Sequence, residues 1–127
     1  MRILLDTCDF LWFITGDARL PALTRQEVQG SVNEVFLSAV SFWEIVIKHS
    51  LGKLPLPESP DVYIPAQRDL HGIRPLALAE SSVKRLVGLP CRHRDPIDRM
   101  LVCQAQDYGM HLASSDPLVR QYPVTLL

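Results

Sequence analysis

Four acidic side chains stand at comparable places in a sequence that alternates between expected strands and helices. They are Asp6, Glu44, Asp98 and Asp116. Asp6 and Asp116 each follow a short apolar run, whereas Glu44 and Asp98 fall in the first turns of two expected helices. In an open parallel sheet, the carboxyl ends of the strands and the amino ends of the helices share one edge, where ligands bind. We therefore expect the four carboxylates to face a single crevice.

Each of these acids also has an ordinary structural explanation. Ser41 and Glu44 have the spacing of a capping box, and Asp98 would be stabilised by the dipole of its helix. Asp95 and Asp116 each precede a proline and would serve as N-caps. Taken together, however, converging carboxylates repel: a pair 4 Å apart costs about 1 kcal/mol in water and about 4 kcal/mol at an effective dielectric constant of 20. The joint occurrence indicates a cluster that needs a compensating cation.

Few basic side chains accompany the acids. Lys48 falls one helical turn after Glu44 and could pair with it, whereas Arg99 adjoins Asp98 but points about 100° away around the helix. Oxygen ligands without cysteine or histidine favour Mg²⁺, with Mn²⁺ as the alternative, and the sequence is compatible with one or two ions. Such a cation activates water and neutralises charge on a phosphoryl group, so we expect hydrolysis of a phosphodiester.

The elements that must position these acids alternate along the chain. We expect strands at Arg2–Leu5, Glu34–Leu37, Ile73–Leu78, His111–Ala113 and Val124–Leu126. We expect helices at Thr7–Thr15 with Thr7 as the cap, at Thr24–Val32, from Ser41 to Leu51, at Val62–His71 and Ala79–Val87, from Asp95 to Tyr108, and briefly at Asp116–Pro117. Residues 55–65 hold four prolines and should form a loop. Strands that alternate with helices predict an α/β fold with a parallel sheet.

Length and composition restrict the protein class. The 127 residues fit one domain, residues 1–127, and 47% hydrophobic against 21% charged residues is typical of a globular chain. A net charge of −1 gives no overall attraction to nucleic acid, so binding must come from local patches. Asp6 and Asp9 interrupt the apolar start, which excludes a signal peptide, and no apolar run could span a membrane. Three cysteines without ligand spacing favour a soluble protein of the reducing cytoplasm.

Three blocks of the sequence resemble the PIN-domain ribonucleases, and specifically the VapC-like toxins of type II toxin–antitoxin pairs. The blocks are LLDTCDFLW, LSAVSFWEIVIKHSLGKL, and HRDPIDRMLVCQAQDYG followed by LASSDPLVRQYPV. They occur in the expected order and cover both ends of the chain. The resemblance implies a three-layer α/β/α sandwich with a central parallel sheet, whose acidic magnesium site cleaves RNA. It also implies homodimerisation and a cognate antitoxin whose tail blocks the active site.

The same resemblance assigns individual positions. The catalytic and metal-ligating acids fall on Asp6, Glu44, Asp98 and Asp116. The third acid is placed at Asp98 and not at Asp95, because DRMLVCQA matches the family's aspartate-led helix. Supporting hydroxyls fall on Thr7 and Ser114. Cys8 stands where relatives usually have histidine, and we expect it to be a small buried residue and not a ligand.

The hypothesis includes a mechanism and an RNA-binding face. Water activated by the metal would attack the phosphorus and leave 3′-hydroxyl and 5′-phosphate ends. No histidine is needed as a base, so His93 is expected at the surface. Arg92, Arg94 and Arg99 lie in the densest basic stretch, beside the helix that carries Asp98, and are predicted to contact RNA.

Three alternative functions compete with this hypothesis. A haloacid-dehalogenase-type phosphatase needs a second aspartate two residues after the first, where this chain has Cys8. A receiver-like phospho-switch should carry a late lysine, yet the last lysine is Lys84. A catalytically silent PIN-like RNA-binding or scaffold module stays open, although the presence of all four acids disfavours it.

Overall fold

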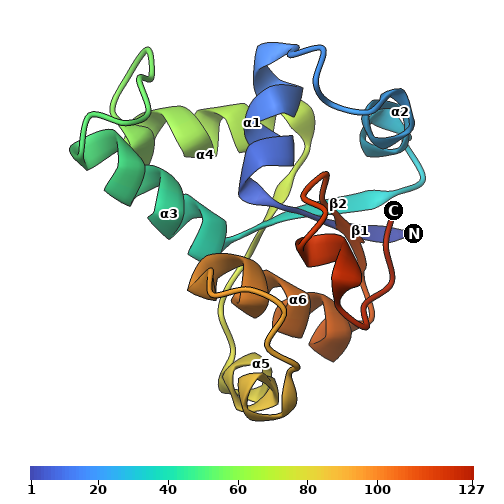
Figure 1. The fold of residues 1–127 in the computed structure, drawn as a ribbon. Helices are drawn as coiled ribbons and strands as arrows, with labels where there is room; N and C mark the ends of the chain where they lie inside the picture. The colour runs from blue at the N-terminus through green and yellow to red at the C-terminus, as the bar shows by residue number, and fades with distance from the viewer.

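The computed structural model describes residues 1–127 and has a four-stranded parallel sheet at its centre (Figure 1). The strands are β1 (Arg2–Leu5), β2 (Glu34–Ser38), β3 (Arg74–Leu76) and β4 (His111–Ala113), in the order β3-β2-β1-β4. The α-helices are α1 (Thr7–Thr15), α2 (Ala22–Gln29), α3 (Ala39–Ser50), α4 (Pro60–His71), α5 (Glu80–Arg85) and α6 (Pro96–Tyr108). Two 3₁₀ helices, η1 (Leu86–Gly88) and η2 (Val119–Gln121), complete the chain. None of the helices is both long and apolar enough to cross a bilayer.

The strand order explains why the ends of the strands form a crevice. The chain proceeds from β1 outward to β2 and β3, and then returns to place β4 on the other side of β1. Leu5 of β1 lies opposite Leu37 of β2 and Ala113 of β4, so these three strands end at one level. A reversal of strand order opens a crevice at the carboxyl ends of the strands. The residues that follow β1 and β4 therefore border this crevice.

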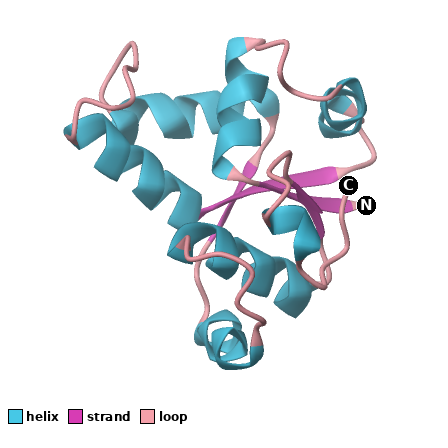
Figure 2. Ribbon diagram, viewed as in Figure 1, coloured by secondary structure: helices cyan, strands magenta, loops and turns pink.

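Alternating side chains on the strands build two separate cores, one on each face of the sheet. Ile3 and Leu5 of β1 pack with residues of α1, α2, α3 and α4. Leu4 of β1 points to the opposite face and packs with α6 and the segment around η2. Because strand side chains alternate between faces, a short apolar strand can serve both cores. The result is the predicted three-layer α/β/α arrangement, with helices above and below the sheet (Figure 2).

The predicted capping box at the start of α3 is wrong. The N-cap lies three residues before Ser41, at Ser38, whose Oγ accepts a hydrogen bond from the Val40 amide at 3.0 Å, and the helix begins at Ala39. Ser38 also donates to Gln104 Oε1 of α6 at 2.6 Å, which holds it at the end of β2. Glu44 consequently lies beyond the first turn, where its carboxylate is not needed as a cap.

Other differences concern the ends of elements. The N-cap of α1 is Asp6, not Thr7, because the Asp6 side chain accepts from the Asp9 amide. The expected strand at Val124–Leu126 is reduced to one parallel bridge between Leu112 and Leu126. The expected helix at Asp116–Pro117 is a turn that leads into η2. The predicted start of α6 is confirmed: Asp95 caps it and Pro96 is its first residue.

Candidate active site

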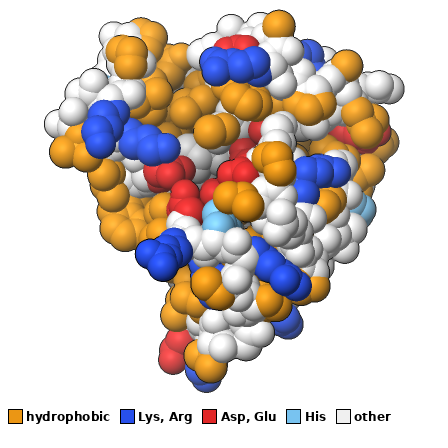
Figure 3. Space-filling view, in the orientation of Figure 1, with side chains coloured by type: hydrophobic (Ala, Val, Ile, Leu, Met, Phe, Trp, Pro, Cys, Tyr) orange, Lys and Arg blue, Asp and Glu red, His pale blue; other side chains and the backbone are white.

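A cavity of about 210 Å³ lies at the carboxyl edge of the sheet, and carboxylates dominate its walls. The lining residues are Asp6, Thr7, Cys8, Asp9, Trp12, Glu44, Lys48, Asp95, Asp98, Ser115 and Asp116. Figure 3 shows acidic side chains gathered in a hollow on one face of the molecule, with basic side chains around it. All four acids singled out from the sequence therefore share one cavity.

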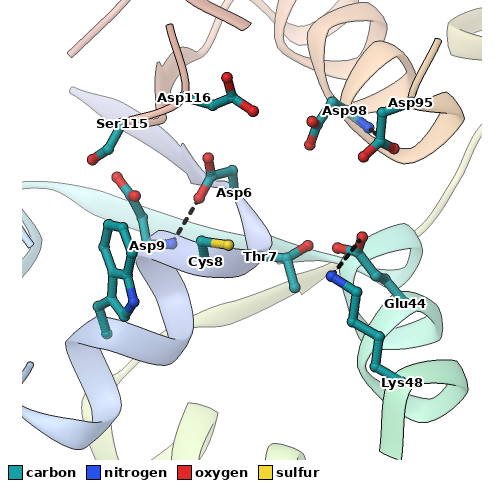
Figure 4. Close-up of a pocket in the computed structure, with 11 residues that line it drawn as sticks. Asp6, Thr7, Cys8, Asp9, Glu44, Lys48, Asp95, Asp98, Ser115 and Asp116 are labelled. Atoms are coloured by element: carbon teal, nitrogen blue, oxygen red, sulfur yellow. Dashed lines mark hydrogen bonds and ion pairs between the residues drawn. The ribbon is translucent and has the colours of Figure 1, made fainter. Parts of the chain in front are cut away.

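Four different segments deliver these acids to the cavity. Asp6 follows β1 and caps α1, Glu44 projects from α3, Asp98 lies in the first turn of α6, and Asp116 follows β4. Two groups of carboxylates face each other across the space (Figure 4). One group comprises Asp6, Asp9 and Asp116, and the other comprises Glu44, Asp95 and Asp98. The cavity is thus a cup formed where separate parts of the chain meet.

Asp6 and Asp9 form the buried floor on one side of this cup. The Asp9 amide donates to Asp6 Oδ1 at 2.7 Å, and both side chains are almost inaccessible to solvent. Burial first, and repulsion from Asp9 second, raise the pKa of Asp6 to about 7. Burial also raises the pKa of Asp9, against the opposing effect of the neighbouring Ser115, and neither carboxylate oxygen of Asp9 accepts a hydrogen bond of normal geometry. Arg120 lies near enough to lower the pKa of Asp9, but neither acid forms a direct ion pair. Buried carboxyl groups without such a pair are costly unless a proton or a cation neutralises them.

Asp98 forms part of the opposite wall and contacts His93, which does not itself line the cavity. The Nε2 atom of His93 lies 3.2 Å from Asp98 Oδ2, and burial followed by repulsion from Asp95 raises the pKa of Asp98 to about 6. The expectation that His93 is a surface group is wrong, because its side chain is only 9% exposed. The loop before α6 folds back over the helix and buries the imidazole between Asp98 and Tyr122.

Glu44 is the one acid of the cup with a basic partner inside it. Lys48 Nζ lies 3.3 Å from Glu44 Oε2, one helical turn away, as the sequence spacing suggested. Lys48 is the only lysine or arginine that lines the cavity. A single positive charge cannot balance the surrounding carboxylates, so the site keeps an excess of negative charge.

The two predicted hydroxyl groups occupy different positions. Thr7 lines the cavity, and its buried Oγ1 has no hydrogen-bond partner. Ser114 is buried and does not line the cavity; its Oγ accepts from the Asp116 amide at 3.2 Å, and its side chain also partly offsets the raised pKa of Asp6. The hydroxyl-bearing residue that lines the cavity in this turn is Ser115.

Several residues that line the cavity were not assigned to the site from the sequence. They are Asp9, Trp12, Asp95 and Ser115, together with Lys48, which was considered only as a partner of Glu44. The spacing of Asp9 was informative, because a residue three positions after Asp6 lies on the same side of a helix. Cys8 was expected to be buried, but it is exposed at the cavity wall. Partial desolvation and the charge of Asp6 raise the pKa of its thiol to about 11, so it stays protonated at neutral pH.

The three arginines predicted to contact RNA differ in their surroundings. Arg92 and Arg94 are exposed in the loop before α6. Arg99 is half-buried, and its Nη1 donates to Pro90 O at 2.9 Å and to the Tyr122 hydroxyl at 3.1 Å. These bonds tie the Arg99 guanidinium to the loop, whereas the other two arginines are accessible to a ligand.

The chemistry of the donor set fits a hard divalent cation. The donors are carboxylate oxygens with uncompensated charge, and the two oxygens of Asp9 lack any partner. As the side chains stand, no three histidine, cysteine or acidic groups surround a common point closely enough to hold an ion. Mg²⁺ keeps several waters and needs only one or two direct carboxylates, so the cup suits an ion bound partly through water.

Comparison with known proteins gives a consistent family assignment. Residues 3–124 match the PIN domain family. Over 79 residues the chain is 40% identical to Ribonuclease VapC16 of Mycobacterium tuberculosis (strain ATCC 25618 / H37Rv). The alignment covers 56% of this chain and 56% of that protein. The match thus spans about half the length of this curated relative.

Solved structures resemble the whole fold at low identity. VapBC2 from Rickettsia felis, bound to a DNA fragment from its promoter, aligns with a TM-score of 0.70 and 13% identity, over 100% of this chain and 97% of the other. VapBC-1 from nontypeable Haemophilus influenzae aligns with a TM-score of 0.63 and 16% identity, over 95% of this chain and 91% of the other. At such identities the likeness concerns the fold alone. Together with the family match over nearly all of its length, it shows that the chain belongs to the PIN domain family.

Proposed function

We propose that this protein is a magnesium-dependent endoribonuclease that acts as the toxin of a toxin–antitoxin pair in the cytoplasm, with residues 1–127 as one nuclease domain. The observation that carries the proposal is the cavity in which Asp6, Glu44, Asp98 and Asp116 meet at the carboxyl edge of the sheet. Membership of the PIN domain family and similarity to a protein named Ribonuclease VapC16 support RNA as the substrate.

The four acids would have different roles in binding the cation. Asp6, Glu44 and Asp98 would bind Mg²⁺, or Mn²⁺, directly or through water, and Asp116 would complete the shell. When bound, the cation supplies water activation and charge neutralisation at the phosphoryl group. Lys48 must then exchange its contact with Glu44 for another partner, and a phosphate of the substrate is the natural one. Thr7 and Ser115 also line the cavity, on different sides of it, and neither hydroxyl has a hydrogen-bond partner within the protein (Figure 4).

Basic side chains around the acidic hollow would hold the RNA backbone. Figure 3 shows lysine and arginine side chains on several sides of the hollow, which suits a chain of phosphates passing over it. Arg92 and Arg94 are the exposed members of the loop that precedes Asp98. We assign them to phosphate contacts, and assign Arg99 mainly to holding this loop through Pro90 and Tyr122.

An antitoxin and a second copy of the chain are the proposed protein partners. Exposed apolar side chains on α3 include Trp43 at 60% exposure and Val46 at 40%, and Leu51 follows them at 62%. A run of this kind on one helix is typical of an interaction surface. The similar solved structures include VapBC2 from Rickettsia felis and a toxin–antitoxin complex from Klebsiella pneumoniae, which supports an antitoxin here.

The test is cleavage of a total RNA pool by the purified protein with Mg²⁺. We expect Asp6→Asn and Asp98→Asn to lose at least 100-fold in rate, because each removes a charged oxygen from the site. Asp69→Asn, at an exposed position of α4, is the matched control and should cleave like the wild type. Cleavage that survives both site substitutions would refute these roles. Tight RNA binding without cleavage, in Mg²⁺ or Mn²⁺, would favour the silent RNA-binding module.

A further inference from the structure

A buried chain of hydrogen bonds runs from the C-terminal segment to the acidic cavity. Tyr122, which follows η2, is 4% exposed, and its hydroxyl lies 2.9 Å from Nδ1 of His93. The other ring nitrogen of His93, Nε2, lies 3.2 Å from Asp98 Oδ2. His93 thus uses both nitrogens, one toward the interior of the fold and one toward the site.

The partners of the Tyr122 hydroxyl determine the direction of this chain. Three donors surround the oxygen and share its two lone pairs: the Arg92 amide at 3.1 Å, the His93 amide at 3.2 Å and Arg99 Nη1 at 3.1 Å. All three of these neighbours are donors and cannot accept a proton. The single phenolic proton therefore has one acceptor within reach, which is His93 Nδ1. The tautomer of histidine follows from such a network.

The tautomer of His93 determines which hydrogen bond it makes to Asp98. If Nδ1 accepts, a neutral His93 carries its proton on Nε2, and this N–H donates to Asp98 Oδ2. The hydrogen bond restricts rotation of the carboxylate and occupies one of its two oxygens, which leaves Oδ1 for a ligand in the cavity. Ligating carboxylates commonly depend on an outer partner of this kind for their orientation.

We propose that His93 is a positioning residue for Asp98, fixed as the Nε2–H tautomer by Tyr122. The proposal rests on the proposed function insofar as Asp98 holds the cation. His93 would not transfer a proton to substrate, since both of its nitrogens are engaged. The hydrogen-bond chain from Tyr122 through His93 to Asp98 therefore links the C-terminal segment to the geometry of the cation site.

The first test concerns the metal-free protein and needs no activity. Long-range ¹⁵N–¹H correlation spectra of the imidazole groups should show His93 as the neutral Nε2–H tautomer at pH 8. In Tyr122→Phe the Nδ1 atom loses its donor, so we expect a mixture of tautomers. Tyr108→Phe is the matched control and should leave the His93 signals unchanged. A wild-type His93 protonated on Nδ1 would overturn the proposal.

The second test measures binding of Mn²⁺ alone by isothermal titration calorimetry. We expect His93→Phe, which removes the donor, to weaken Mn²⁺ binding about 10- to 100-fold, the usual effect of losing an outer partner. His93→Gln keeps an N–H at the same reach and should restore affinity to within about threefold of the wild type. His71→Phe, at an exposed position at the end of α4, is the control for loss of a histidine.

The outcomes separate this proposal from the proposed function. A wild type that binds no Mn²⁺ would remove the cation site and both proposals with it. A wild type that binds, with His93→Phe binding equally well and melting at the same temperature, would refute only the role of His93. Loss of affinity in both His93→Phe and His93→Gln would also refute it, because rescue by a donor is what positioning requires.

Discussion

The carboxylate of Asp6 accepts a hydrogen bond from the amide of Asp9 at 2.7 Å, so two buried acids share the first turn of α1. The Asp9 side chain is 1% exposed and its oxygens have no partner, while Asp6 borders the same cavity. The hydrogen bond caps the helix, but it does not balance the charge of either group. The arrangement is stable only when protons or a cation neutralise part of that charge.

The cost of burying the charged Asp6 carboxylate should appear in the pH dependence of the stability of the metal-free protein. The pKa of Asp6 is raised from 3.8 to about 7, so between these values the folded state binds a proton that the unfolded state does not. The contribution of Asp6 to the free energy of unfolding therefore falls as pH rises through that window. We expect Asp6→Asn to exceed the wild type in stability by a few kcal/mol at pH 8, and by much less at pH 5.

Urea denaturation in EDTA at the two pH values would measure the difference. Asparagine keeps an oxygen that can accept from the Asp9 amide, so the helix cap is preserved in the variant. Asp69→Asn, an exposed substitution, should show no such change with pH. A stability difference between Asp6→Asn and the wild type that does not vary between pH 5 and pH 8 would contradict the raised pKa.

Replacing Asp9 should have opposite effects on the metal-free and the cation-bound protein. Asp9→Asn removes a buried charge that repels Asp6, so the metal-free protein should gain about 1–3 kcal/mol at pH 8. It also removes negative charge from the cavity, so the Mg²⁺ concentration for half-maximal cleavage should rise severalfold. Thermal unfolding in EDTA and a Mg²⁺ titration of the cleavage rate would check both parts. A variant that is destabilised without metal would show that Asp9 has a structural partner.

The sequence was informative where local rules determine the structure. Asp95 followed by Pro96 predicted the start of α6, and the apolar run Arg2–Leu5 predicted a strand, whose side chains the structure buries in the cores on both faces of the sheet. The same strand and helix ends placed Asp6 and Asp98 at one edge of the sheet before any contact was known. These predictions rest on short stretches of chain, whose preferences do not depend on distant residues.

Where distant residues decide, the sequence did not suffice. Ser41 and Glu44 have the spacing of a capping box, but Ser38 caps α3 because it also bonds to Gln104, 66 residues away. The burial of His93 depends on Tyr122, 29 residues further along the chain. Local spacing cannot reveal such partners, because several equally good local arrangements compete and a tertiary contact selects one.

The buried bond between Ser38 and Gln104 predicts a loss of stability that extends to the site. Gln104 accepts from Ser38 Oγ at 2.6 Å and donates to Ala77 O at 3.3 Å, and so joins the start of α3 to α6. Gln104→Ala would leave both partners unsatisfied and open a cavity, at a cost of about 2–4 kcal/mol. Since α3 and α6 carry Glu44 and Asp98, the apparent Mg²⁺ affinity should also fall.

Denaturant midpoints and Mn²⁺ calorimetry on Gln104→Ala would separate these two effects. Gln106→Ala is a suitable control, because it lies two residues away on the same helix and its Nε2 bonds to Pro123 O at a distance from the cavity. The control should lose about 1 kcal/mol or less, with unchanged Mn²⁺ affinity. Equal Mn²⁺ affinity in Gln104→Ala and the wild type would show that this bond does not position the acids.

Lys48 competes with a cation for Glu44. Lys48 Nζ lies 3.3 Å from Glu44 Oε2, and the lysine side chain is 46% exposed. Breaking this ion pair should therefore change the free energy of unfolding by less than about 1 kcal/mol. Lys48→Met removes the competing charge and should lower the Mg²⁺ concentration for half-maximal cleavage. If Lys48 then contacts a phosphate, the KM for RNA should rise in the same variant. Lys53→Met, outside the cavity, is the control; a KM equal to that of the wild type would exclude the phosphate contact.

The arginines around α6 should divide into two functional groups. Arg92 and Arg94 are exposed, so Arg92→Ala and Arg94→Ala should each weaken RNA binding severalfold and reduce its salt dependence, without changing the melting temperature. Arg99→Ala breaks bonds to Pro90 O and the Tyr122 hydroxyl, so it should instead destabilise the fold by about 1–3 kcal/mol. Binding measured in the Asp98→Asn background avoids cleavage of the probe. Equal affinity of Arg92→Ala, Arg94→Ala and the parent for a single-stranded RNA would remove both arginines from the RNA-binding face.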